Sequence, residues 1–92
     1  MPQEIMKQLG EKLHIMRTIH GLTQKDVADH LHVKRSTYAY YELGRIEPSL
    51  DTAVAISDFF EISLDNLLRQ WSSLQVFQSL YRKNLLRLYR RI

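Results

Sequence analysis

Apolar residues recur along this chain at the spacing of α-helices. Ile5, Leu9, Leu13 and Met16 follow one another at steps of four, four and three, which is the period of an amphipathic helix. Gly21 comes next, at the place where a left-handed residue commonly ends a helix. Four shorter helices are predicted beyond it, around residues 24–31, 35–43, 50–60 and 64–69.

Polar residues and glycine mark the ends of these short helices. Thr23 and Asp26 have the spacing of a capping box, with Asp in place of Glu or Gln. Ser49 and Ser63 are favourable N-caps for the fourth and fifth helices, and Gly44 ends the third. Because only about three residues separate the second helix from the third, residues 23–44 read as a helix-turn-helix. We therefore expect an all-α, five-helix domain over residues 1–70.

The last part of the chain, residues 71–92, reads as an added amphipathic helix. Its apolar positions have steps of three and four, close to an eleven-residue repeat that keeps a stripe on one face. This helix has three interpretations: it folds back on its own domain, pairs with a second subunit, or binds an acidic partner such as DNA or a membrane surface. We expect dimerisation, with Trp71 as an anchor. The expected interface residues are Phe59, Trp71, Leu74, Phe77, Tyr81, Leu85 and Leu88.

Charge is divided unevenly along the 92 residues, whose formal net charge is +3. Residues 1–65 hold seven Lys/Arg and ten Asp/Glu, whereas residues 66–92 hold six Lys/Arg and no acid. Nucleic-acid binding by the first part must therefore depend on local clusters of positive charge rather than on the total.

Composition and motifs argue against several other functions. The chain has no cysteine, and His30 and His32 do not share a helical face, so we predict no metal site or cofactor. The serines lie at helix caps or in the tail, without a nucleophile elbow, and we predict no enzyme activity. No signal peptide is evident, and no apolar run reaches the roughly 20 residues of a membrane span. We expect a cytoplasmic protein.

Three of the five tyrosines fall within the third predicted helix. Tyr38 and Tyr41 are three residues apart and share a face, which we expect to turn inward. Tyr40 and Ser36 are four residues apart on another side, which we expect to face outward. In a helix-turn-helix the second helix lies in the major groove while the first crosses the DNA backbone.

Residues 9–68 resemble the Cro/phage-repressor (XRE-type) helix-turn-helix family. The matching features are Arg17, "LTQ" at 22–24, Ala28, Val33, "YELG" at 41–44, Pro48, and "SLD" at both 49–51 and 63–65. The resemblance implies a lambda-repressor-like fold and sequence-specific binding of double-stranded DNA by a homodimer. It also implies that the protein regulates transcription by binding a palindromic operator, and we expect it to act as a repressor. The alternative is a protein-interaction module, such as an antitoxin or an adaptor that sequesters a partner through its C-terminal helix.

The resemblance also assigns roles to single residues. It implies base contacts for Arg35, Ser36, Ala39 and Tyr40. It implies contacts to the DNA backbone for Gln24, Lys25, Lys34, Arg45 and Ser49. Arg17 and Glu42 match an ion pair that links the first helix to the end of the third.

The chain departs from the family pattern at four positions. His32 and Glu61 stand where the family often has glycine, and either costs roughly 1 kcal/mol if its backbone is left-handed. Lys34 replaces a Ser or Thr N-cap, which is typically worth about 1 kcal/mol. Tyr38 replaces a smaller aliphatic residue, which bears on how the third helix packs.

Overall fold

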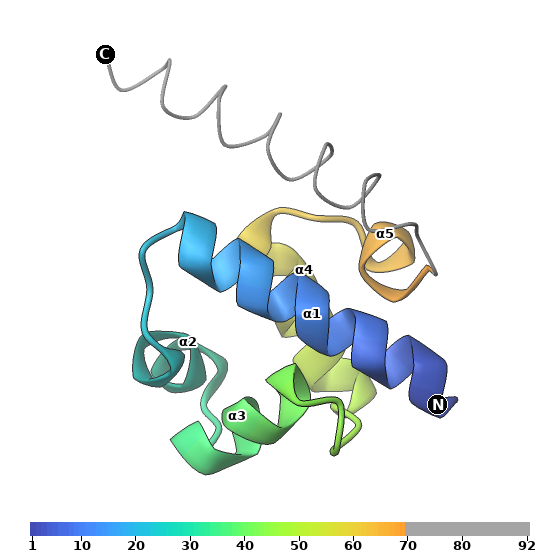
Figure 1. Ribbon diagram of the computed structural model, residues 1–92. Coiled ribbons are helices and arrows are strands. Elements are labelled where there is room, and N and C mark those ends of the chain that lie inside the picture. The colour runs from blue at the N-terminus through green and yellow to red at the C-terminus, as the bar shows by residue number, and fades with distance from the viewer. Residues whose placement is uncertain (70–92) are drawn as a thin grey trace.

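Five helices make up the part of the chain that the computed structural model describes, residues 1–69 (Figure 1). They are α1 (Gln3–Ile19), α2 (Gln24–Leu31), α3 (Arg35–Glu42), α4 (Leu50–Phe60) and α5 (Leu64–Leu68). Residues 1–69 contain no strand, so the predicted all-α fold is confirmed. The expected sixth helix, with its contacts from Trp71 to Leu88, lies outside the described residues.

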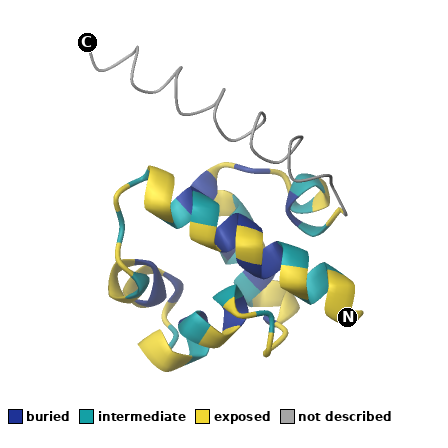
Figure 2. Ribbon diagram, viewed as in Figure 1, coloured by how far each residue is buried: buried dark blue, intermediate teal, exposed yellow. Residues whose placement is uncertain are grey.

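Helix α1 crosses the domain and packs against both α3 and α5 (Figure 1). Helix α2 packs against α3 and α4, and α4 packs against α5. The apolar faces of these helices meet in one core, which appears dark blue in Figure 2. Its buried members are Leu9, Leu13, Met16, Val27, Ala28, Leu31, Tyr38, Tyr41, Ile56, Phe60, Ile62 and Leu67. No helix within residues 1–69 has the length and apolar character that crossing a membrane requires.

The predicted helix caps are present. Thr23 Oγ1 accepts a hydrogen bond from the Asp26 amide at 3.0 Å, and Asp26 Oδ2 accepts one from the Thr23 amide at 2.9 Å. Ser49 and Ser63 each accept from a backbone amide of the following turn at 3.1 Å. These bonds satisfy amides that a helix N-terminus leaves without intrahelical partners, so the sequence itself sets where α2, α4 and α5 begin.

Within residues 1–69, left-handed backbone occurs at two residues that carry a side chain. His32 has φ +58° at the end of α2, and Glu61 has φ +53° at the end of α4. These are the two positions where the resemblance led us to expect glycine. Each residue therefore carries a backbone penalty of about 1 kcal/mol, offset by the rest of the fold.

Gly10 brings α1 and α3 into backbone contact. The residue is buried, and a Cβ atom built on it would lie 2.3 Å from the Glu42 carbonyl oxygen and 2.7 Å from that of Tyr41. Only a hydrogen atom fits in this space. The glycine therefore fixes how closely the C-terminal end of α3 approaches α1.

Lys12 holds the end of α5 against α1, a contact that our sequence reading missed. Its side chain is 1% exposed, and Nζ donates to the carbonyl oxygens of Asn66 at 3.0 Å, Leu67 at 3.1 Å and Arg69. Those carbonyls belong to the helix end, where acceptors lack intrahelical donors. Burial lowers the pKa of Lys12 to about 8. Its spacing of three from Leu9 and four from Met16 was the available signal, because it places a lysine on the apolar face of α1.

Candidate nucleic-acid interface

Helix α3 presents a polar outer face and an apolar inner face. Lys34, Arg35 and Ser36 are exposed at its start, and Tyr40 is 42% exposed one turn later. Ala39 is half-buried beside them. The helix has no side-chain N-cap, so the amides of its first turn lack an intrahelical or capping partner there. Donors and one aromatic ring therefore gather on a single exposed face.

The inner face of α3 is formed by the other two tyrosines. Tyr38 is 0% exposed and Tyr41 is 5% exposed. Their rings meet edge to face, with centroids 6.4 Å apart and an interplanar angle of 87°, a favourable arrangement for two aromatic rings. The larger residue at position 38 is thus accommodated in the core, and the tyrosines divide as the helical period predicts.

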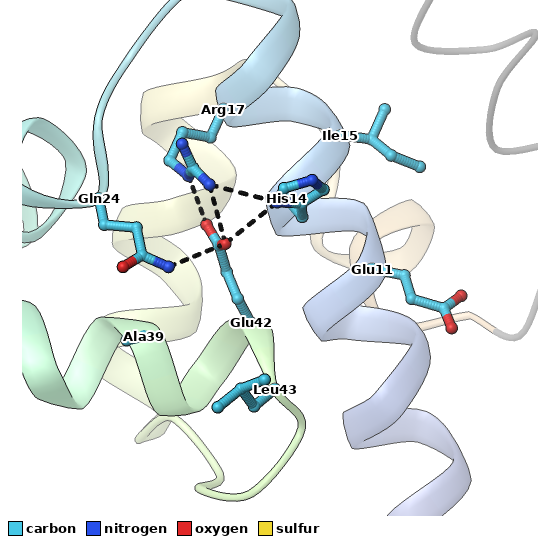
Figure 3. A pocket seen from close by; sticks show the side chains of 8 residues that line it. All are labelled: Glu11, His14, Ile15, Arg17, Gln24, Ala39, Glu42 and Leu43. Atoms are coloured by element: carbon cyan, nitrogen blue, oxygen red, sulfur yellow. Dashed lines mark hydrogen bonds and ion pairs between the residues drawn. The ribbon is translucent and has the colours of Figure 1, made fainter.

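An ion pair joins α1 to the end of α3 (Figure 3). Arg17 Nε lies 2.6 Å from Glu42 Oε2, and Arg17 Nη2 lies 3.1 Å from Oε1. Arg17 Nη1 also donates to the Leu22 carbonyl at 2.9 Å, which ties down the segment before α2. The Glu42 side chain is 6% exposed and that of Arg17 is 15% exposed. The pair is therefore largely shielded from water. Opposite charges attract each other more strongly in such a shielded place than on the protein surface.

Gln24 extends this pair to the start of α3. Its Nε2 donates to Glu42 Oε1 at 3.2 Å (Figure 3), and its Oε1 accepts from Arg35 Nη1 at 3.3 Å. Because these bonds use both ends of one amide, the orientation of the Gln24 side chain is fixed. The exposed Arg35 is thereby connected, through Gln24 and Glu42, to the half-buried Arg17.

The Glu42 carboxylate is ionised in this setting. Burial acts to raise the pKa of Glu42, but the contacts with Arg17, Tyr38 and Gln24 outweigh it and the pKa lies below its usual 4.5. The same pair raises the pKa of Arg17, mainly through its hydrogen bond to Glu42. Both charges therefore persist at neutral pH.

The buried Tyr38 hydroxyl lies next to this ion pair. Burial and the neighbouring Glu42 raise the pKa of Tyr38, so the phenol stays protonated. The oxygen makes no hydrogen bond of good geometry to any of residues 1–69. An unsatisfied buried hydroxyl is a cost to stability, and it sits where this chain departs from the family pattern.

An open cleft lies beside Glu42, between α1 and α3 (Figure 3). Its lining residues are Glu11, His14, Ile15, Arg17, Gln24, Ala39, Glu42 and Leu43. His14 Nδ1 lies 3.3 Å from Glu42 Oε1 and 3.2 Å from Arg17 Nη2. Our sequence reading did not include His14; its spacing of three from Arg17 on α1 was the only signal for it.

The residues expected to contact the DNA backbone differ in how free their side chains are to bind a phosphate. Lys34 and Arg45 are exposed near the two ends of α3. Lys25 is also exposed, but its Nζ lies 2.7 Å from Asp29 Oδ2 on the same helix. The Ser49 hydroxyl is occupied as the cap of α4, accepting from the Thr52 amide and donating to Thr52 Oγ1. A phosphate at α4 would therefore meet backbone amides rather than this hydroxyl.

Phe59, an expected dimer contact, already packs within the domain. Its ring stacks on His30 with centroids 4.1 Å apart, and it lies 4.8 Å from the ring of Phe60. The side chain is half-buried, so part of it still reaches the surface.

Two short helices, a three-residue turn and an outward face of donors define a helix-turn-helix domain. The helix-turn-helix family model matches residues 13–67, and the chain belongs to the Cro/phage-repressor-like family of helix-turn-helix transcriptional regulators.

Known proteins with similar sequences and structures carry the same description. The chain is 42% identical over 69 residues to the uncharacterized HTH-type transcriptional regulator YqaE of Bacillus subtilis, covering 75% of this chain and 60% of YqaE. It is 32% identical over 82 residues to the HTH-type transcriptional activator BcrR of Enterococcus faecalis, covering 89% of this chain and 40% of BcrR. The match thus spans roughly half of these relatives' length. A crystal structure of a transcriptional regulator from Listeria innocua superposes with a TM-score of 0.63 at 30% identity, covering 84% of this chain and 76% of that one.

Proposed function

We propose that this regulator binds a specific sequence of double-stranded DNA as a homodimer and represses transcription in the cytoplasm. The observation that carries the proposal is the series of contacts from Arg17 through Glu42 and Gln24 to Arg35. A side chain that reads bases must be held in position before DNA arrives, because ordering a long flexible side chain on binding costs about 0.5–1.5 kcal/mol. Arg35 is held in this way while its guanidinium stays exposed.

The outer face of α3 has the chemistry to read base edges in the major groove. Arg35 can donate two hydrogen bonds to a guanine, which is worth about 1–3 kcal/mol of discrimination. Ser36 can donate or accept, and the ring of Tyr40 can rest on a thymine methyl group. Ala39 lies between them and leaves room for a base edge to approach the helix.

Around this face, cations and free amides suit the phosphates. We propose backbone contacts from Gln24, Lys34 and Arg45, together with amides at the start of α4. Lys25 can join them only by leaving Asp29. Since residues 1–65 carry a net negative formal charge, the attraction of this part of the chain to phosphates depends on these local contacts. The two cations Lys34 and Arg45 in each subunit, four per dimer, predict a slope of about −4 in a plot of log K against log salt concentration.

The dimer places two α3 helices on one face of the DNA. A two-fold pair reads two half-sites about one helical turn, roughly 34 Å, apart on a palindromic operator. We propose residues 71–92 as the main dimerisation element and residues 1–70 as the DNA-binding domain. The support is the apolar stripe from Leu74 to Leu88, which needs a partner surface.

Repression is the simpler outcome for such a domain. Occupying an operator is enough to block access to it, whereas activation requires a further contact. The Enterococcus relative is described as an activator, but this chain matches only 40% of that protein. A reporter gene placed behind the DNA sequence that this protein binds distinguishes repression from activation. Producing the protein lowers reporter expression if it is a repressor and raises expression if it is an activator.

A second function, that of an adaptor or antitoxin which sequesters another protein, is favoured by one observation. The helical domain is net negative outside the surroundings of α3, which is unusual for a protein whose main partner is a polyanion. Selection from random duplexes separates the two functions. We expect one palindromic sequence to be enriched by the full chain, and no enrichment at any salt concentration would favour the adaptor.

Light scattering tests the dimer separately. We expect the full chain to have the mass of a dimer and a 1–70 truncation to have the mass of a monomer. A truncation that stays dimeric would exclude residues 71–92 as the sole interface.

A further inference from the structure

His14 lies against the contacts that hold Arg35 in place, although the proposed function gives it no role. Its Nδ1 atom is 3.2 Å from Arg17 Nη2 and 3.3 Å from Glu42 Oε1 (Figure 3). His14 is three residues before Arg17 on α1, and its side chain is 61% exposed. The ring can therefore exchange protons with water while it touches both members of the ion pair.

The Glu42 oxygen that His14 approaches already has two donors. Oε1 accepts a hydrogen bond from Arg17 Nη2 at 3.1 Å and another from Gln24 Nε2 at 3.2 Å (Figure 3). An ionised carboxylate offers about four lone pairs on its two oxygens, so two bonds fill this oxygen. A third donor at Oε1 must therefore displace one of the two.

The neutral His14 ring is not such a donor. Arginine nitrogens only donate, so the contact with Arg17 Nη2 makes Nδ1 the acceptor, and we assign the proton of the neutral ring to Nε2. A second proton, on Nδ1, ends that bond, and the ring then donates to Glu42 Oε1 instead. Because hydrogen bonds from charged donors are roughly twice as strong as those from neutral ones, the neutral amide of Gln24 is the donor that leaves.

Titratable groups face the His14 ring from α1 and α3. The cleft beside the ring is lined by Glu11 and Arg17 from α1 and by Glu42 from α3, whereas α2 contributes only the uncharged Gln24. On the other side of α1, the ammonium group that packs on α5 is bonded to backbone carbonyls there. The charges that act on the ring are therefore those of the ion pair and the exposed Glu11.

The groups of the ion pair keep their protonation states while a histidine changes its own. The pKa of Glu42 is lowered and that of Arg17 is raised, so both stay charged in mild acid. Burial raises the pKa of the neighbouring Tyr38, which stays protonated. Histidine is the side chain whose charge ordinarily changes between about pH 5 and 8. Mild acid therefore acts on these contacts through His14.

Gln24 carries the change to the DNA-facing side of α3. Its Oε1 accepts from Arg35 Nη1 at 3.3 Å, and its Nε2 bond to Glu42 fixes the orientation of the amide. Once that bond is lost, the amide can turn and Arg35 is no longer held. Arg35 must then be ordered at the moment of binding, which weakens the contact it makes.

We propose that His14 is a proton-sensitive positioning residue, whose protonation releases Gln24 from Glu42 and lowers the selectivity of Arg35 for its DNA sequence. The inference rests on the proposed function for the role of Arg35. The added positive charge itself attracts phosphates of any sequence. Acid therefore weakens the preference for the right duplex rather than DNA binding as such.

Nuclear magnetic resonance of the full chain without DNA tests the first step. The ring protons of His14 and the side-chain amide of Gln24 are followed from pH 8 to pH 5.5 in the wild type and in His14→Ala. We expect the Gln24 amide signals to shift with the same midpoint as the His14 ring, and to stay in place in His14→Ala. Gln24 signals that do not follow the titration of His14, or that shift equally in His14→Ala, would overturn the proposal.

Fluorescence anisotropy tests the second step, with the selected duplex and a scrambled duplex at both ends of that pH range. The ratio of the two affinities should fall roughly 2- to 12-fold from pH 8 to pH 5.5 in the wild type, the cost of ordering one side chain. It should fall equally in the control His30→Ala, an exposed histidine on α2, and stay constant in His14→Ala. A constant ratio in the wild type, or an equal fall in His14→Ala, would show that His14 does not control selectivity. If no duplex is enriched at any pH, the proposed function has failed, and the Gln24 titration still decides whether His14 releases the amide.

Discussion

Replacing Glu42 by glutamine removes the negative charge at the centre of the contacts between α1, α2 and α3. The amide keeps the shape of the side chain and one acceptor oxygen, so packing changes little. It cannot accept at both oxygens, as Glu42 does from Arg17 Nε at 2.6 Å and Nη2 at 3.1 Å. Arg17 is left as a cation with a 15% exposed side chain and no opposite charge beside it.

The size of the effect follows from that burial. Removing one partner of a buried ion pair costs about 3–5 kcal/mol. Because one acceptor remains and Arg17 keeps its bond to the Leu22 carbonyl, we expect the low end, about 3 kcal/mol. For a domain of this size that corresponds to a fall in melting temperature of roughly 12–24 °C.

The assay is urea unfolding of the wild type, Glu42→Gln and the control Glu11→Gln at several pH values. Glu11 lines the same cleft but is exposed, so its variant should change the free energy of unfolding by less than about 0.5 kcal/mol. The pKa of Glu42 is lowered in the folded protein. Its contribution is therefore complete above its unfolded pKa near 4.5 and is lost as pH falls through the folded value. Two results would refute this reasoning. One is a loss of unfolding free energy at pH 7 that is no greater for Glu42→Gln than for Glu11→Gln. The other is a difference in unfolding free energy between wild type and Glu42→Gln that grows below pH 4.

Three further substitutions test other parts of the account. Because burial lowers the pKa of Lys12 to about 8, the unfolded chain binds more protons between pH 8 and 10.5. The stability of the wild type relative to Lys12→Met should therefore rise through that window, by at most about 3 kcal/mol; a flat difference in urea unfolding would contradict it. Gly10→Ala should lower the free energy of unfolding by about 1–3 kcal/mol, because its Cβ would lie 2.3 Å from the Glu42 carbonyl oxygen. An unchanged melting temperature would mean that α1 and α3 can move apart without loss of stability. Tyr38→Phe removes a buried hydroxyl without a partner of good geometry and should leave stability unchanged or raise it by up to about 1 kcal/mol; a loss above 1 kcal/mol in calorimetry would show that the hydroxyl is bonded.

The helices and their limits were predictable because each is encoded locally. The capping box at Thr23 and Asp26, the serine caps and the apolar periods depend on neighbours within one or two turns. The inward and outward division of the α3 tyrosines follows from the helical period alone. The ion pair of Arg17 and Glu42 spans 25 residues, and only the resemblance to a family made it predictable.

Other contacts depend on how separate helices meet, and the sequence held only faint signals for them. Lys12 reaches carbonyls of residues more than 50 positions away, so its burial depends on where α5 ends. The close approach at Gly10 requires the position of α3. His32 and Glu61 take left-handed backbone although neither is glycine, because the fold around them determines the turn. The stacking of Phe59 on His30 likewise depends on the packing of α2 against α4.

The account rests most heavily on Arg35 as a side chain that reads DNA. The direct measurement is fluorescence anisotropy of the selected duplex and of a scrambled duplex with wild type, Arg35→Ala and Arg69→Ala. Arg69 is an exposed arginine outside the α3 face, paired with Asp65 at 2.9 Å. Loss of one guanine contact, about 1–3 kcal/mol, predicts that Arg35→Ala binds the selected duplex roughly 5- to 150-fold more weakly and the scrambled duplex only a few-fold more weakly, while Arg69→Ala stays within about twofold of wild type. Equal losses on both duplexes, or equal effects of the two substitutions, would contradict the account.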